Sequence, residues 1–192
     1  MPNNKISVVI IAILFSSVSA QSSRAQQDKP IKHRAVHFEG LVIPEDLKQL
    51  SAASDAICVV RINNQAQADV FDPVYVVGTK YGFTVEEIIK SDSRLLQIGA
   101  MSDVYRMGGD RDKGDHIDSV DERDFPRFVI GREYILFLRW MTRQSEYWIA
   151  GGSVGAFEVD DARVVPLSKF TWVQSLRGMP ISKLIATVKS NQ

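Results

Sequence analysis

The stretch from Glu133 to Met141, EYILFLRWM, decides the fold class of this chain. As a strand it would place Tyr134 and Leu136 on one face. Ile135 and Phe137 would lie on the opposite face, so both faces are apolar. A strand that is apolar on both faces is covered on both sides by other parts of the protein. We therefore predict a mainly β protein in which this strand is central.

Other segments of the chain also have strand patterns. Residues 56–63 (AICVVRIN) and 74–90 (VYVVGTKYGFTVEEIIK) are rich in β-branched and aromatic residues, and residues 95–107 show a weaker form of the pattern. Shorter predicted strands, separated by turn residues, follow the central strand: 146–150, 156–159 and 163–165.

Two segments have helical patterns. Residues 44–53 (PEDLKQLSAA) open with proline and acidic residues, which favour the start of a helix. Residues 180–189 (PISKLIATVK) carry one apolar stripe that would pack on the sheet: Ile181, Leu184, Ile185 and Val188. We predict a short N-terminal helix before the first of these strands and a C-terminal helix after the last.

The first twenty residues have the three parts of a secretory signal peptide. Lys5 provides the positive start, residues 6–15 are almost all apolar, and small residues up to Ala20 form a cleavage site. The apolar run is about half the length that spans a bilayer as a helix. We expect cleavage to leave Gln21 first, with no membrane span afterwards. The sequence thus predicts export, to the periplasm or the extracellular space.

The remaining chain divides into a leader and one domain. Residues 21–37 are polar, mostly basic and without periodicity, which predicts a flexible leader. Residues 38–192 are enough for a single domain with a hydrophobic core. Cys58 is the sole cysteine, so no disulfide forms within the chain, and its place in a predicted strand indicates a buried apolar residue.

The charge balance argues against nucleic acid as a partner. The chain has 23 Lys and Arg residues and 23 Asp and Glu residues, so its net charge is zero. Without an overall positive field, nothing draws the protein to a phosphate backbone.

The order of these elements resembles a known architecture. Five segments carry the resemblance: SDA at 54–56, FTVEEIIK at 83–90, IGREYILFL at 130–138, YWIAGG at 147–152 and GAF at 155–157. In this order the chain resembles the OB-like barrel of tissue inhibitors of metalloproteinases and netrin-type modules, in a cysteine-poor form found in bacterial exported proteins. The resemblance implies a barrel of five to six strands whose exposed face and loops bind a ligand.

The inhibitory mechanism of that family does not extend to this chain. The inhibitors chelate the zinc of the protease through a cysteine at the mature N-terminus, and disulfides hold that terminus rigid. Gln21 would begin the mature chain here, and Cys58 has no partner.

One motif raises the alternative of an enzyme. Residues 151–155 (GGSVG) match G-x-S-x-G, the nucleophile elbow of α/β-hydrolases, with Ser153 as the nucleophile. That elbow needs a helix after the serine and a histidine later in the chain. Residues 156–159 have a strand pattern instead, and the last histidine is His116. We therefore interpret the motif as a glycine-rich turn that requires positive φ.

An acidic stretch raises the alternative of a metal site. Residues 108–124 (GGDRDKGDHIDSVDERD) contain the weak calcium candidates Asp110, Asp112, Asp115, Asp118 and Asp121. Their spacing departs from the EF-hand, because glycine falls at position 5 and aspartate replaces the glutamate of position 12. We interpret the stretch as a solvated loop, with calcium as the alternative and no other cofactor expected.

Taken as a whole, the sequence favours an exported, noncatalytic binding module. Its ligand would be a protein or another component of the cell envelope. The alternatives are an enzyme, with a serine hydrolase site at Ser153 or a metal in the acidic stretch, and a structural protein of the envelope.

Overall fold

The computed structural model describes residues 29–36, 42–68, 77–91, 96–142 and 145–190. The predicted signal peptide and most of the predicted leader lie outside these residues. The strands, in chain order, are β1 (Ile31–Val36), β2 (Ala56–Ala68), β3 (Gly78–Ser91), β4 (Met101–Met107), β5 (Gly109–Asp112), β6 (Ile117–Glu122), β7 (Glu133–Met141), β8 (Glu146–Ile149), β9 (Ala156–Asp160) and β10 (Arg163–Pro166). The helices are α1 (Leu47–Ala52), α2 (Thr171–Gln174) and α3 (Ile181–Ser190), and η1 (Gly152–Gly155) is a 3₁₀ turn.

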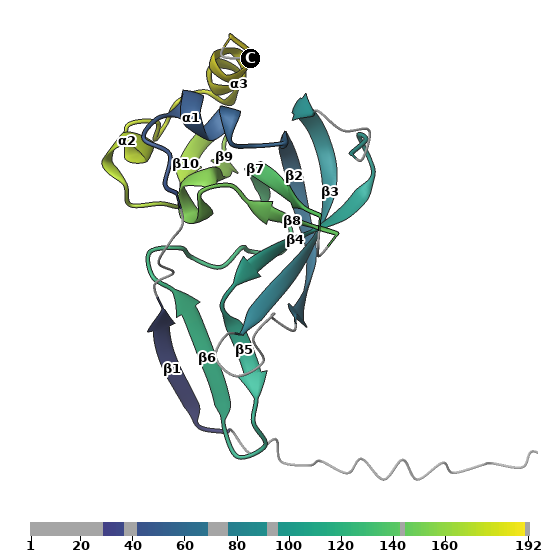
Figure 1. Ribbon diagram of the computed structural model, residues 1–192, viewed down its shortest axis with the longest axis vertical. Helices are drawn as coiled ribbons and strands as arrows, with labels where there is room; N and C mark the ends of the chain where they lie inside the picture. The colour runs from purple at the N-terminus through teal and green to yellow at the C-terminus, as the bar shows by residue number, and fades with distance from the viewer. Residues whose placement is uncertain (1–28, 37–41, 69–76, 92–95, 143–144, 191–192) are drawn as a thin grey trace, which may run out of the picture.

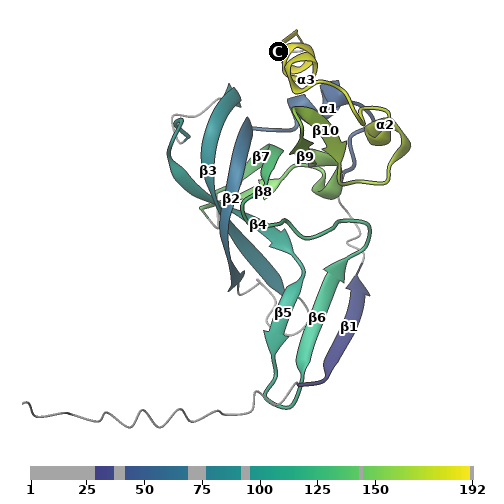
Figure 2. The same ribbon diagram turned by 180° about the vertical axis from the view of Figure 1, so that it is seen from behind.

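Five strands close into a barrel, as Figures 1 and 2 show from opposite sides. The order around the barrel is β2, β3, β4, β8 and β7, and β7 pairs back with β2. The β4–β8 pairing is parallel, whereas the other four pairings are antiparallel. Strands β9 and β10 extend the sheet from β7. The predicted mainly β, OB-like fold is confirmed at this level.

Strand β7 separates two hydrophobic cores. Its residues Tyr134, Leu136 and Leu138 point into the barrel, where they meet residues from the other barrel strands. Ile135 and Phe137 point outward, into a second core that α1 and α3 cover. All five side chains are fully buried, as predicted for a strand covered on both sides.

The two predicted helices cover this second core. In α1 the side chain of Asp46 caps the N-terminus by accepting a hydrogen bond from the backbone N–H of Gln49, and Leu50 is buried. In α3 the buried residues are Leu184 and Val188, two members of the predicted stripe. Within the described ranges, no helix has the length and apolar character needed to cross a bilayer.

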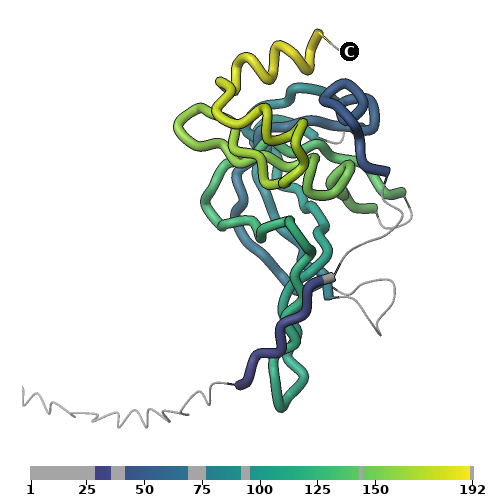
Figure 3. The backbone as a smooth tube through the Cα atoms, turned by 90° about the vertical axis from the view of Figure 1, so that its left-hand side faces the viewer, coloured from purple at the N-terminus to yellow at the C-terminus, as the bar shows by residue number. Residues whose placement is uncertain are grey.

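A three-stranded sheet projects from the barrel, and we call it the arm (Figure 3). In it, β6 pairs with β5 in antiparallel and with β1 in parallel. The sequence predicts a leader through residue 37 and a loop over residues 108–124, whereas the structure has Ile31–Val36 in β1 and a β5–β6 hairpin. Both segments are too polar to show a strand pattern, and each is ordered by pairing with the other.

Two glycines let the chain pass from the barrel into the arm. Gly108 and Gly109 have φ values of 89° and 144°, a region that other residues rarely adopt. A Cβ atom on Gly109 would lie 2.3 Å from the hydroxyl oxygen of Thr79. That hydroxyl donates a hydrogen bond of 2.7 Å to the carbonyl of Gly108, which fixes the transition from β4 to β5.

Candidate binding site

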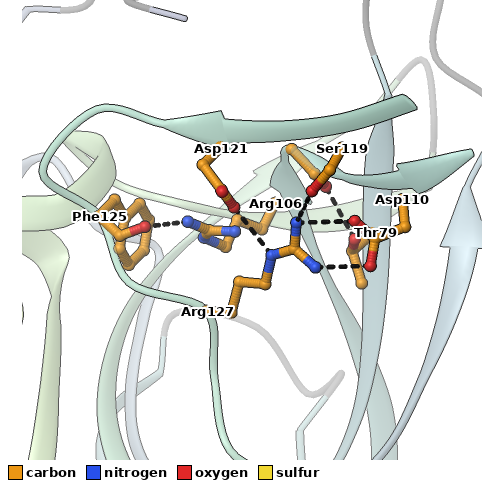
Figure 4. A network of polar contacts seen from close by, with 8 residues as sticks. Thr79, Arg106, Asp110, Ser119, Asp121, Phe125 and Arg127 are labelled. Carbon is orange, nitrogen blue, oxygen red and sulfur yellow. Dashed lines mark hydrogen bonds and ion pairs between the residues drawn. The ribbon is translucent and has the colours of Figure 1, made fainter. Parts of the chain in front are cut away.

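One arginine holds the arm together at its base, as Figure 4 shows. Arg127 lies between β6 and β7, and its Nη1 and Nη2 donate to both carboxylate oxygens of Asp110, at 2.7 and 2.9 Å. Its Nε donates to Asp121 at 2.8 Å, and Nη2 also donates to the hydroxyl of Ser119 at 2.9 Å. Arg127 thus joins β5 and β6 to the segment that enters the barrel.

The pairing of β5 with β6 places these partners on one face. Asp110 lies opposite Ser119 in the antiparallel register, and Asp121 is two residues further along β6. Hydrogen bonding to Arg127 lowers the pKa of Asp110. The same bond raises the pKa of Arg127, so this ion pair is fully charged at neutral pH.

A second arginine lies buried beside the first. Arg106 is the second-last residue of β4, and it is only 2% exposed. Its Nη2 donates to the carbonyl of Phe125, and its guanidinium carbon lies 4.5 Å from the centre of the Phe125 ring. Among the described residues, Nε and Nη1 have no hydrogen-bond partner. Burial lowers the pKa of Arg106 because charge is costly away from water.

Tyr81, which interacts electrostatically with Arg106, is also buried. Burial raises the pKa of Tyr81, and the positive charges of Arg106 and Arg127 oppose that shift. The Tyr81 hydroxyl lies near both cations but does not form a hydrogen bond of ordinary geometry with them. Tyr81 also lines a small polar pocket of 130 Å³, with Thr79, Asp110 and Arg127 around it.

A larger cleft of 660 Å³ opens at the base of the arm, and we call it the junction cleft. Its acidic lining residues are Asp121, Glu122 and Asp124, and its basic ones are Arg127, Lys169 and Arg177. Asp121 is paired with Arg127 and Asp124 with Lys169. Apolar residues that line it include Phe125, Pro126, Pro166 and Leu167. Burial raises the pKa of Glu122, and Arg106 opposes that shift.

The five candidate calcium ligands do not converge. Asp110 and Asp121 bind Arg127, and each of the other three pairs with a separate basic residue: Asp112 with Lys29 at 2.6 Å, Asp118 with Arg34 at 2.6 Å and Asp115 with His116 at 2.6 Å. In the part of the chain that the structure describes, no three His, Cys, Asp or Glu side chains form a group suited to a metal ion. The sequence pattern alone did not predict the ion pairs of Asp112 and Asp118, because Lys29 and Arg34 are remote from them in sequence.

Ser153 does not lie on a nucleophile elbow. It is in η1, is 9% exposed and is followed by strand β9 instead of a helix. The histidines that the structure describes, His33 and His116, lie on or beside the arm. Positive φ occurs at Gly151 and Gly152, as expected of a glycine-rich turn.

Gly155 is required for close packing and not, as the motif suggests, for a positive φ. Its φ is not positive, but an added Cβ atom would lie 2.1 Å from the carbonyl oxygen of Ala150. Close packing of backbone against backbone therefore explains this glycine.

Cys58 is buried inside the barrel, as its predicted strand position indicated. Burial raises the pKa of its thiol to about 12, so the thiol is protonated at neutral pH. This cysteine therefore contributes to packing.

Comparison with known proteins gave no match, either to a protein-family profile or to a curated protein. The resemblance to metalloproteinase inhibitors and netrin-type modules therefore rests on the barrel architecture alone.

Proposed function

We propose that this chain is an exported, noncatalytic binding module whose ligand is a protein or another component of the cell envelope. The junction cleft carries the proposal. Acidic, basic and apolar residues line it together, and this combination suits a protein surface that has both charged and apolar side chains. Among the described residues that line the cleft there is no serine, cysteine or histidine.

Inhibition of metalloproteinases through their zinc is not part of this proposal. The inhibitor family uses an N-terminal cysteine for that contact, and Gln21 stands at the proposed mature N-terminus. What the resemblance contributes is the barrel as a scaffold for surface recognition.

The proposal is tested by capture of partners from a cell-envelope extract. The bait is the mature protein, and partners are fixed by chemical cross-linking and identified by mass spectrometry. In the test variant, Lys169→Glu and Arg177→Glu reverse two of the positive charges that line the junction cleft. The matched control reverses two exposed lysines of α3, Lys183→Glu and Lys189→Glu, so the net charge change is the same.

We expect the cleft variant to lose at least about tenfold of the captured partner, because reversed charges at a contact are repulsive. The α3 variant should retain it. Equal capture by both variants would refute a binding role for the cleft.

Export is tested separately by sequencing the N-terminus of the protein purified from its native cells. We expect Gln21 as the first residue, because the apolar run of the signal peptide is too short to remain as an anchor. A protein that retains Met1 and is extracted only by detergent would contradict export.

A further inference from the structure

The outer edge of β1 has no strand partner among the residues that the structure describes. In the strand order of the arm, β1 is at one end and β6 is its neighbour. The carbonyl of Pro30 accepts a hydrogen bond of 3.0 Å from the backbone N–H of Ile117. Because backbone groups alternate in direction along a strand, those of Lys32 also face β6, whereas those of His33 face away from it. Within the described ranges, no other strand pairs with this edge.

The side chains of β1 have a definite chemical pattern. On one face lie Lys32 and Arg34, on the same side as Asp118 of β6. Arg34 is already paired with Asp118, but Lys32 forms no ion pair within the described ranges. On the other face lie Ile31, which is 54% exposed, His33 and Ala35. The edge thus has two basic residues on one face and a histidine between two apolar residues on the other, and residues 29–36 contain no acid.

We propose that an extended segment of a partner protein, with alternating acidic and apolar residues, adds to the outer edge of β1 as a fourth strand of the arm. This inference rests on the proposed binding function and specifies its partner. Backbone hydrogen bonds to the edge would supply affinity, and acidic side chains beside Lys32 would supply specificity. The remaining side chains of the segment would cover Ile31 and Ala35.

A second copy of this chain is a poorer occupant of the same edge. Antiparallel pairing of two β1 strands would bring Lys32, His33 and Arg34 of both copies together, and like charges across a pair of strands are destabilising. Charged edge strands commonly prevent such self-association. The charge of β1 therefore selects for an acidic partner.

The edge also leads to the junction cleft. In the parallel register Val36 lies beside Glu122, and Glu122 lines the cleft. A strand added to β1 would therefore run along the arm toward the cleft.

The test uses the complete mature protein and synthetic peptides that carry a fluorescent label. The probe is an octapeptide of alternating glutamate and valine, acetylated and amidated at its ends, and its binding is followed by fluorescence anisotropy. A lysine–valine peptide of the same length is the charge control. Two further versions of the probe are N-methylated, one on every glutamate and the other on every valine.

We expect saturable binding of the glutamate–valine peptide and at least about tenfold weaker binding of the lysine–valine peptide. One N-methylated version should lose binding and the other should keep most of it, because only alternate amides of an added strand face β1. No binding at peptide concentrations up to about 1 mM, or equal loss with both methylated versions, would overturn the inference.

The same edge is tested by changing the protein instead of the peptide. Ala35→Pro removes a backbone N–H that points away from β6, so the β1–β6 pairing keeps its hydrogen bonds. We expect at least about a tenfold loss of probe binding. The control, Ala35→Val, retains the N–H group and should bind the probe normally. Equal binding by both variants would overturn the inference.

Two further outcomes separate this inference from the function on which it rests. If the probe fails to bind but the junction-cleft variant still loses its envelope partner, the inference is overturned and the proposed function stands. If the protein forms a dimer that Ala35→Pro abolishes, the edge belongs to a second copy and the acidic partner is overturned.

Discussion

The barrel and the arm are stabilised by different forces. The barrel encloses a core of side chains with almost no exposure, among them Phe83, Tyr134 and Leu136. In the arm the described side chains of β1 are exposed, and Val120 is the main buried apolar residue. Ion pairs connect the strands of the arm instead, through Arg127 at the base and through Arg34 further along β1.

This difference indicates which part of the molecule opens at the lower free energy. Burial of apolar surface responds little to pH or to moderate salt, whereas exposed ion pairs weaken with both. An element with few buried apolar contacts opens at a lower free energy than a core strand. We therefore expect the arm to open while the barrel stays folded.

The largest effect is expected from a cavity in the core of the barrel domain. Phe137→Ala removes a fully buried ring that contacts Phe157 at a centroid distance of 5.8 Å. The free energy of unfolding should fall by about 3–5 kcal/mol. Chemical denaturation followed by circular dichroism measures the change.

The arm supplies the control for this prediction. Ile31→Ala truncates a residue that is 54% exposed, so it should change the free energy of unfolding by less than about 0.5 kcal/mol. Comparable losses in the two variants would show that the arm shares the hydrophobic core and would break the comparison.

The sequence predicted the barrel well because its strands owe their form to local apolar patterns. The two apolar faces of β7 are visible in nine consecutive residues, and the structure confirms both the boundaries and the burial of that strand. The barrel-lining face of β2, with Cys58, is equally visible. Helix α1, with its acidic start, and helix α3, with its apolar stripe, were also predicted. The short α2 was not predicted, because it has no side-chain cap.

The arm and the junction cleft were not predictable in this way. The partners Arg34 and Asp118 are 84 positions apart, and neither neighbourhood has an apolar face that indicates a strand. The junction cleft combines Arg127 with Lys169 and Arg177, which follow β10 and are remote from Arg127 in sequence. Patterns in a single segment do not contain such information, because the interactions that order these segments are remote in sequence.

A smaller effect, confined to the arm, is expected when its arginine clamp is removed. Arg127→Met deletes the charge that binds Asp110, Asp121 and Ser119, so β5 and β6 lose their link to the segment before β7. Because these carboxylates are about half exposed, the local loss should be about 1 kcal/mol. Hydrogen exchange should become several-fold faster in β5 and β6 and stay unchanged in β7.

Two variants serve as controls for the clamp. Arg127→Lys keeps the charge but lacks the planar fork that binds both oxygens of Asp110, so it should recover part of the protection. Arg139→Met removes an exposed arginine of β7 and should leave the exchange of the arm unaltered. Faster exchange throughout the barrel in Arg127→Met would mean that the arm and the barrel open as one unit.

The smallest effect on stability is expected from acidification, which weakens the ion pairs of the arm. Hydrogen bonds from Arg127 and Arg34 lower the pKa values of Asp110 and Asp118, respectively. Their contribution to stability is therefore complete above the pKa of an unfolded aspartate, about 3.9, and is lost as the pH falls through the lower folded values. Each exposed pair contributes at most about 1 kcal/mol.

Glu122 contributes to the pH dependence of stability in the opposite direction from Asp110 and Asp118. Burial raises its pKa, so its ionisation costs stability, and protonation on acidification offsets part of the loss from the aspartates. We expect hydrogen exchange in β5 and β6, corrected for its intrinsic pH dependence, to accelerate below about pH 4 while β7 remains protected. Replacing Asp110 by asparagine should reduce this acid sensitivity. If β7 instead loses protection together with β6, the arm and the barrel open at the same free energy. Ion pairs would then not distinguish the stability of the arm from that of the barrel.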